Sequence, residues 1–303
     1  QLAFAVITPA LISGSIAERM KFPAFLAFIL LWTTFVYDPI AHWIWGNGGW
    51  IRELDALDFA GGSVIHISSG VSALVAAIYI GKRSNHDSIK PHNIPMTMIG
   101  AGLLLFGWYG FNAGSALAIN DIALNAFIAT NTSAAAAGLS WMFCEWLIHK
   151  KPTALGFVSG IVAGLVSITP GAGFVSPFAS LMIGLIGGIV CFYGVTVLKK
   201  KFAYDDALDA FGCHGIGGIW GGIATGIFAT INPAIEGGLL DGNIRLLVAE
   251  VISILAVVTY AGIVSYLLLK LISQFMQLRV SAQEEEIGLD YAIHGETAYG
   301  SIK

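Results

Sequence analysis

The sequence contains few charged residues. Only 11% of its 303 residues are Asp, Glu, Lys or Arg, whereas about 25% is usual for a soluble domain. This shortage excludes an ordinary water-soluble domain, and a formal net charge of −4 offers no basic surface for a nucleic acid. Hydrophobic residues make up 56% of the chain and the mean hydropathy is +0.77. The composition therefore predicts a protein that lies in a lipid bilayer.

The sequence also lacks the motifs of common enzyme classes. It has no phosphate-binding loop, nucleophile elbow, HExxH or Rossmann glycine signature. Its three cysteines, Cys144, Cys191 and Cys213, form no CxxC pair and lie in or beside apolar runs. We expect them to be small buried hydrophobic residues. We expect neither an enzyme nor a bound cofactor or metal.

Long apolar runs divide the chain into candidate membrane spans. A bilayer core requires roughly 20 apolar residues per helix. Nine runs are predicted to span, at 2–17, 22–45, 60–81, 94–118, 123–148, 153–169, 174–198, 210–231 and 244–273. The fold class expected is therefore an all-α polytopic membrane protein, with one transmembrane domain over residues 1–273.

The basic residues predict the orientation of these spans. With nine spans, 13 of the 15 Lys and Arg residues fall on one side, and only Arg52 and Arg245 fall on the other. Basic residues are enriched in cytoplasmic loops. The polar tail, residues 274–303, is therefore expected on the cytoplasmic side, where it is either disordered or packed on that face of the bundle.

Two histidines stand inside long apolar runs, His66 in DFAGGSVIHISSG and His214 in DAFGCHGIGG. An ionisable ring at membrane depth is costly and usually faces a cavity or another polar group. One such ring is most simply explained as a brace between two helices. Two rings, each beside small residues that leave room, indicate a narrow path with polar points. A zinc pair is the other interpretation, but no third ligand stands at metal spacing.

Aromatic and hydroxyl side chains are expected near the outer ends of several spans. These are Phe4, Trp45, Phe111 and Ser115. Phe111 and Ser115 are four residues apart and so share one helix face. Aromatic faces attract cations by about 0.5–2 kcal/mol, and a hydroxyl accepts a hydrogen bond from an N–H donor. The alternative is an interfacial aromatic belt, which we favour for Trp43 and Trp50.

Acidic residues precede both histidine spans. Asp58 stands eight residues before His66, near the outer mouth. We expect it mainly to cap that helix through free backbone N–H groups, although it would also favour a cation. Before the other histidine, Asp209 is expected to cap the helix, while Asp205 and Asp206 are expected to be solvated.

The motifs of this sequence resemble those of the ammonium transporter, methylammonium permease and Rhesus protein family. The resemblance runs along the whole chain and includes AERMKFPAF (17–25), PIAHWIWGNGG (39–49), LDFAGGSVIHISSG (57–70), GKRSNHDSIKPHNIPM (81–96), GWYGFNAGSA (107–116), DDALDAFGCHGIGGIWG (205–221) and GLDYAIHGETAY (288–299). Trp45 and Ser115 favour the ammonium transporter branch, because the Rhesus branch typically lacks both.

The resemblance implies a role for each matching residue. It implies a cation-recruitment site of Phe4, Trp45, Asp58 and Ser115, a phenyl gate of Phe4 and Phe111, and a pore lined by His66, His214, Trp108 and Ser159. It further implies a homotrimer with one pore per subunit, a PII-type signal protein at the cytoplasmic face, and ammonium, ammonia or methylammonium as the transported species.

The resemblance also implies eleven spans, two more than the nine found. The chain opens at Gln1 inside an apolar run, with no basic segment or cleavage site that would indicate a signal peptide. We therefore expect that the first two spans of the family are missing from this chain and that its inverted repeat is incomplete.

The expected function is selective ammonium uptake across the cytoplasmic membrane. Three alternatives stay open at this point. The first is an ammonium sensor that signals to a cytoplasmic partner, although no signalling domain follows the tail. The second is a gas channel of the Rhesus kind. The third is a truncated product without activity.

Overall fold

The computed structural model describes residues 1–84, 90–230 and 237–299. Within these ranges the chain is helical, apart from turns and two isolated β-bridges. The main elements are α1 (Leu2–Ile16), α2 (Phe22–Trp32), α3 (Asp38–Trp45), α4 (Ser68–Ile80), α5 (Ile94–Ala113), α6 (Asp121–His149), α7 (Ala154–Ile168), α8 (Pro177–Tyr193), α9 (Lys199–Phe202), α10 (Ile216–Phe228), α11 (Ile244–Ile272) and α12 (Ala282–Ile287).

Each of the nine predicted runs contains a helix. Six helical segments are long and apolar enough to cross a membrane, namely Phe22–Trp45, Gly62–Ile80, Ile94–Ala116, Asp121–His149, Pro177–Phe202 and Ile244–Ile272. Two more, α1 and α7, are shorter apolar helices. The all-α membrane fold is thus confirmed, while the number of nine crossings stays a prediction. Residue 231 of the eighth run, residues 85–89 of the matched loop motif and residues 300–303 of the tail lie outside the described residues.

Short polar residues begin many of these helices. The side chains of Asn93, Asn120, Thr153 and Ser176 accept the backbone N–H two or three residues into the helix that follows. Such caps satisfy N–H groups that have no partner inside the helix. These four residues therefore mark the positions at which α5, α6, α7 and α8 begin.

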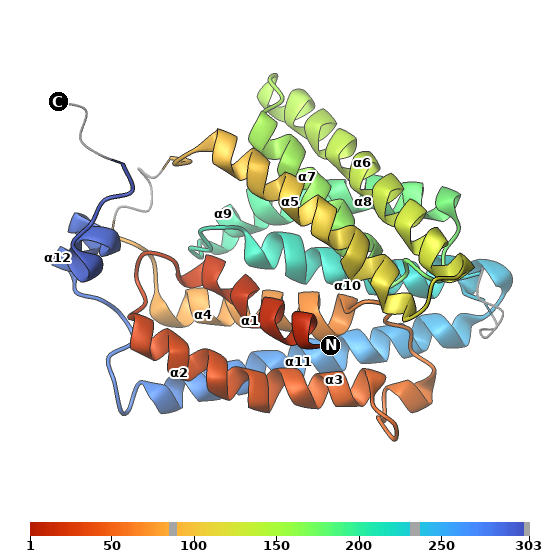
Figure 1. Ribbon diagram of the computed structural model, residues 1–303, viewed down its shortest axis with the longest axis horizontal. Helices are drawn as coiled ribbons and strands as arrows, with labels where there is room; N and C mark the ends of the chain where they lie inside the picture. The colour runs from red at the N-terminus through yellow and green to blue at the C-terminus, as the bar shows by residue number, and fades with distance from the viewer. Residues whose placement is uncertain (85–89, 231–236, 300–303) are drawn as a thin grey trace.

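Small residues let α6, α7 and α8 pack closely, as Figure 1 shows for α6 and α7. A Cβ atom on Gly160 of α7 would lie 2.7 Å from the carbonyl oxygen of Ala137, and one on Gly188 of α8 would lie 2.5 Å from the same oxygen. Close backbone approach through small residues is the usual way in which helices associate in lipid. A second group, α1, α2, α4 and α11, encloses an apolar core around Phe28 and Trp32.

Among the described residues, three of the six segments long enough to cross a membrane contain a π-helical turn, and a further π-helical turn directly precedes α10. These turns are η1 (Thr33–Tyr37), η3 (Gly62–Ile67), η6 (Gly194–Leu198) and η7 (Phe211–Gly215). The first links α2 to α3 and the third links α8 to α9. The other two contain His66 and His214 themselves and lead into α4 and α10. A π-helical turn widens the backbone locally and occurs frequently at functional sites.

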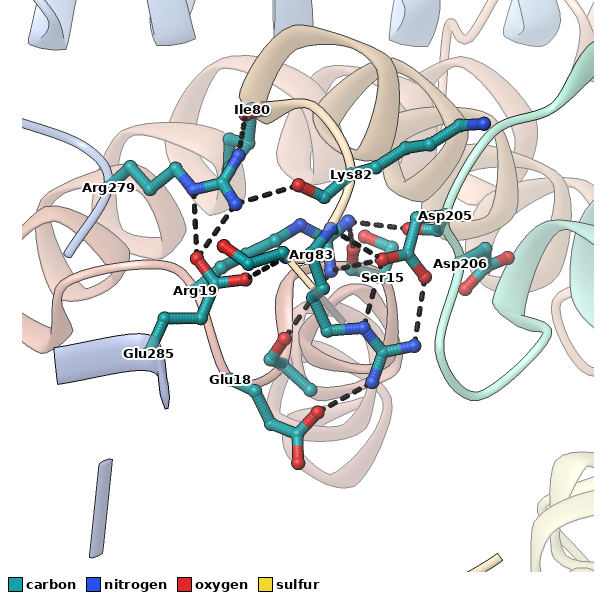
Figure 2. A network of polar contacts seen from close by, with 12 residues as sticks. Ser15, Glu18, Arg19, Ile80, Lys82, Arg83, Asp205, Asp206, Arg279 and Glu285 are labelled. Atoms are coloured by element: carbon teal, nitrogen blue, oxygen red, sulfur yellow. Dashed lines mark hydrogen bonds and ion pairs between the residues drawn. The ribbon is translucent and has the colours of Figure 1, made fainter. Parts of the chain in front are cut away.

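The sequence left open whether the tail is disordered or packed on the bundle. In the structure, residues 278–280 of the tail pack on the bundle. The backbone N–H of Lys21 donates to Leu278 at 2.8 Å, and that of Val280 donates to Arg19 at 3.0 Å. Arg279 donates to the carbonyl oxygens of Ile80 and Lys82. The tail thus contacts the ends of α1 and α4, as Figure 2 shows for the side chain of Arg279.

An ion network at the same end of the molecule joins the chain after α1, the chain after α4 and the loop before η7. Arg83 binds both carboxylate oxygens of Asp205 and also binds Glu18 (Figure 2). Arg19, which is fully buried, donates to the Asp205 carbonyl at 2.5 Å and lies 3.8 Å from its carboxylate. The expectation that Asp205 and Asp206 are solvated is wrong, because both are fully buried.

Candidate functional site

The two histidines come together in the middle of the bundle. Their Nδ1 atoms are 3.2 Å apart and the ring centroids are 5.2 Å apart. His66 is 1% exposed and His214 is 8% exposed. Since the contact joins Nδ1 to Nδ1, one ring must donate and the other must accept, so the two neutral rings carry opposite tautomers at this contact.

Close backbone packing holds the two histidine segments against each other. A Cβ atom on Gly70 of α4 would lie 2.5 Å from the Cα of Gly215, which directly follows His214. Real Cβ atoms do not approach another backbone so closely. The glycine therefore sets the spacing between the two helices and, through it, the contact between the rings.

The aromatic rings of Trp108 and Phe111 stack against the ring of His66. Trp108 stacks on it with ring centroids 5.3 Å apart and an interplanar angle of 20°, and Phe111 lies 6.0 Å away at 23°. Trp108 Nε1 donates to the hydroxyl of Thr169 at 3.0 Å. The Nε2 atom of His66 is buried and has no hydrogen-bond partner among the described residues. A buried polar atom without a protein partner is rare and needs an explanation, such as a bound water or a ligand.

A cavity of about 650 Å³ lies next to these rings, and five of the candidate residues predicted from the sequence line it. Its lining includes Phe4, Trp45, Asp58, Phe111 and Ser115. The Phe4 and Phe111 rings meet edge to face, 4.6 Å apart. Phe4 and Trp45 are 5.7 Å apart. The rings of Trp45, Phe4, Phe111 and His66 therefore form one continuous series from the cavity to the histidine pair.

Asp58 anchors the start of the His66 segment. Its two carboxylate oxygens accept the backbone N–H groups of residues 61, 62, 63 and 64, at 2.6–3.0 Å. Its carbonyl oxygen accepts Nε1 of Trp45 at 2.7 Å. The expected capping role of Asp58 is confirmed by this geometry. One residue thus connects the Trp45 ring to the helix of His66.

The second acidic residue of the site was assigned incorrectly from the sequence. Asp206, and not Asp209, accepts the backbone N–H of Phe211 at the start of the His214 segment, at 2.8 Å. Asp209 instead binds Lys199 Nζ at 2.7 Å. The spacing contained the signal that was missed, because Asp206 precedes His214 by the same eight residues that separate Asp58 from His66.

The remaining predicted residues lie as follows. Ser115 donates its hydroxyl to the Phe111 carbonyl at 2.8 Å and lines the cavity from the 3₁₀ turn that follows α5. Ser159 on α7 donates to the carbonyl of Leu155 in its own helix, and the described contacts do not join it to the histidine pair. Trp43 packs on Trp50 and Tyr260, outside the cavity.

Asp205 and Asp206 are adjacent carboxyl groups that lie outside the spans and are both buried. Burial alone would raise the pKa of Asp205, but its hydrogen bonds and ion pairs with Arg83 and Arg19 hold that pKa well below its usual range. Burial raises the pKa of Asp206, which the backbone N–H groups at the start of η7 partly oppose. The pKa values of the two neighbouring carboxyl groups are therefore shifted in opposite directions.

These features define a polytopic α-helical membrane transport protein, with an aromatic cavity that leads to a buried polar pair. The chain belongs to the Ammonium Transporter Family, whose model matches residues 1–299. It is 57% identical over 301 residues to the ammonium transporter of Bacillus subtilis (strain 168), covering 99% of this chain and 74% of that protein. It is 53% identical over 304 residues to ammonium transporter Amt1 of Archaeoglobus fulgidus, covering 99% of this chain and 76% of that protein.

Solved structures agree with this assignment. Saccharomyces cerevisiae Mep2 matches with a TM-score of 0.87 at 37% identity, over 92% of this chain and 65% of that chain. A structure described as a Sensor Amt Protein matches with a TM-score of 0.90 at 31% identity, over 97% of this chain and 75% of that chain. The chain therefore spans about two thirds to three quarters of these proteins.

Proposed function

We propose that the protein carries ammonium across the cell membrane, with the cavity as its entry and the histidine pair as its narrow part. The observation that carries the proposal is the continuous series of rings from Trp45 to His66, with His214 beyond it. Family membership and the ammonium transporters of B. subtilis and A. fulgidus support it.

The cavity fits a small cation that carries N–H groups. The faces of Trp45 and Phe4 attract positive charge, and the Ser115 hydroxyl oxygen is an acceptor for N–H. Asp58 contributes negative charge at the mouth, although its side-chain oxygens already bind four backbone N–H groups. In this proposal, these four residues recruit ammonium.

Beyond the cavity, the path is apolar. The contact between Phe4 and Phe111 closes it, and a full charge is costly in such surroundings. Ammonium gives up its proton at or below this gate. The proton is released to water on the outer side or is relayed through the imidazoles of His66 and His214, and neutral ammonia passes the histidine pair with Trp108 and Ser159 as further lining. Nε2 of His66, which has no partner in the part of the chain that the structure describes, offers it a hydrogen bond. Potassium is rejected because nothing in an apolar tube replaces its hydration shell, as carbonyl rings do in potassium filters.

The finer assignments belong to the same proposal. We place the C-terminal tail and the ion network of Asp205 on the cytoplasmic side, in accord with the bias of Lys and Arg. The functional unit is a homotrimer with one pore per subunit, and a PII-type protein binds the cytoplasmic face.

Uptake of labelled methylammonium tests the pore. His66→Ala and His214→Ala should each lose most of the uptake, whereas His149→Ala, at the exposed end of α6, should keep it. Undiminished uptake that still excludes potassium in both pore variants would show that the histidines do not line the path.

A sensor is the second candidate function, favoured by the match to the structure described as a Sensor Amt Protein. Expression in a strain that lacks ammonium uptake separates the two functions. A transporter restores growth on low ammonium, and a sensor does not.

A further inference from the structure

We infer that Glu250 is a positioning residue for ammonium recruitment, because its carboxylate fixes the loop that carries Asp58. The inference rests on the proposed function. Glu250 lies in α11, where it is 1% exposed. Its Oε1 atom accepts the backbone N–H of Leu57 at 2.6 Å. A carboxylate buried in an apolar span is costly unless it is hydrogen-bonded. We therefore expect the hydrogen bond to Leu57 to have a structural role.

The neighbouring helix leaves space for the Glu250 side chain. A Cβ atom on Gly226 of α10 would lie 3.2 Å from Cγ of Glu250, and one on Gly222 would lie 3.7 Å from its Oε2. A larger residue at Gly226 would also meet the Cα of Leu247 at 2.8 Å. Two glycines one turn apart thus admit the carboxylate between α10 and α11.

The loop that Glu250 holds has no regular secondary structure from residue 56 to residue 58, so a few hydrogen bonds determine its position. Leu57 is bonded to Glu250, and the N–H of Phe59 donates to the carbonyl of Pro170 at 3.0 Å. Asp58 stands between these two anchors. Its carbonyl receives Trp45 Nε1, and its carboxylate holds the His66 segment.

Glu250 itself is not among the residues that line the cavity. Its effect must therefore pass through Leu57 and Asp58 to the ring of Trp45. Loss of the Glu250 contact frees one of the two anchors of the loop, and the Asp58 carbonyl then no longer fixes the ring. The consequence expected is weaker recruitment of the cation, with a smaller effect on the maximal rate of passage.

Three substitutions test this in the full chain. Glu250→Gln keeps an acceptor oxygen in place, Glu250→Asp withdraws the carboxylate by one C–C bond, about 1.5 Å, and Glu250→Ala removes it. The Asp and Ala variants lose the hydrogen bond to the Leu57 N–H, whereas the Gln variant keeps it. We therefore expect Glu250→Asp and Glu250→Ala to raise the KM for methylammonium about tenfold, with a smaller change in maximal rate, and Glu250→Gln to resemble the parent protein.

Glu145 provides a matched control. Its carboxylate also accepts a backbone N–H, that of Thr153 at 2.8 Å, but between α6 and α7 and away from the cavity. Glu145→Ala should leave KM unchanged even if it lowers the amount of folded protein. If Glu250→Ala does not accumulate, Glu250→Asp decides by the same criterion.

The inference is overturned if Glu250→Asp transports with the KM of the parent protein, or if Glu250→Gln is as impaired as Glu250→Asp. Both outcomes require a parent protein that takes up methylammonium. A parent protein without uptake would contradict the proposed function instead, so the two failures are distinguishable.

Discussion

Asp206 caps the start of the His214 segment in the same way as Asp58 caps the start of the His66 segment. Each carboxylate accepts backbone N–H groups at the start of a π-helical segment, and each precedes the histidine of that segment by eight residues. Asp58 holds four N–H groups, whereas Asp206 is bonded to Phe211 and leaves its Oδ1 without a partner among the described residues. The two histidine segments thus begin with the same kind of cap, but among the described residues Asp58 accepts more hydrogen bonds than Asp206 does.

This relationship predicts that Asp206→Ala damages the His214 segment. Loss of a helix cap costs about 1–2 kcal/mol, so both the unfolding temperature in detergent and methylammonium uptake should fall. Asp209→Asn is the control, because its carboxylate forms only a partly exposed pair with Lys199 and Asn tolerates the positive φ at that position. Equal losses in the two variants would contradict the assigned cap.

The close approach of Gly70 to Gly215 predicts a severe effect of a single methyl group. Gly70→Ala forces α4 and η7 apart, because backbone atoms cannot yield as a flexible side chain can. The histidine contact should lengthen and uptake should be lost. Gly100→Ala on α5, where a Cβ meets nothing within 4 Å, should behave as the parent protein. Normal uptake by Gly70→Ala would show that the helices separate without cost to function.

The pairing of Asp205 predicts a loss of stability in acid. The pKa of this carboxyl is lower in the folded protein than in the unfolded chain, because of Arg83 and Arg19. Its contribution is therefore complete above the unfolded pKa of about 3.9, and it is lost as the pH falls below that value. The unfolding temperature of the parent protein should therefore drop as the pH falls from about 4 toward the lower pKa of the folded state.

The same measurement on Asp205→Asn provides the control for that acid effect. This variant should be less stable at neutral pH, because Arg19 stays buried without a carboxylate partner in contact. Its unfolding temperature should then depend less on pH over the acid range. A slope identical to that of the parent protein would assign the acid sensitivity to other carboxyl groups.

The cavity predicts that removing the polar group of either Trp45 or Ser115 weakens recruitment. Trp45→Phe keeps an aromatic face but removes the Nε1 bond to Asp58, so the KM for methylammonium should rise several-fold with little loss of maximal rate. Ser115→Ala removes a hydroxyl that is bonded only to its own helix among the described groups, so it should raise KM without affecting stability. Trp43→Phe, which lies outside the cavity, is the control that should change neither.

The sequence allowed the helices and most of the cavity to be predicted, because hydropathy and the positions of caps are local properties. Apolar runs gave the helical segments to within a few residues, and Phe4, Trp45, Phe111 and Ser115 do meet around one space. Their meeting was inferred from family motifs. A single sequence does not state which helices are neighbours.

The π-helical turns and the buried ion network could not be predicted in this way. A π-turn differs from an α-turn in that its hydrogen bond spans five residues instead of four, and this change is too small to be detected in the hydrophobic periodicity. Asp205 and Arg83 are 122 residues apart in the chain. A stretch such as YDDALD is indistinguishable from a solvated loop until its distant cationic partners are known, which is why Asp205 and Asp206 were assigned to solvent.

The contact between Arg19 and Asp205 also has a consequence for biosynthesis. The two residues are separated by 186 positions, so the ribosome must make two thirds of this chain before the arginine meets its carboxylate. Until then, the guanidinium group must stay at an aqueous surface or be held by the insertion machinery. The packing of α1 at this end is therefore a late event, and a nascent chain stalled before residue 205 should leave Arg19 accessible to water-soluble reagents.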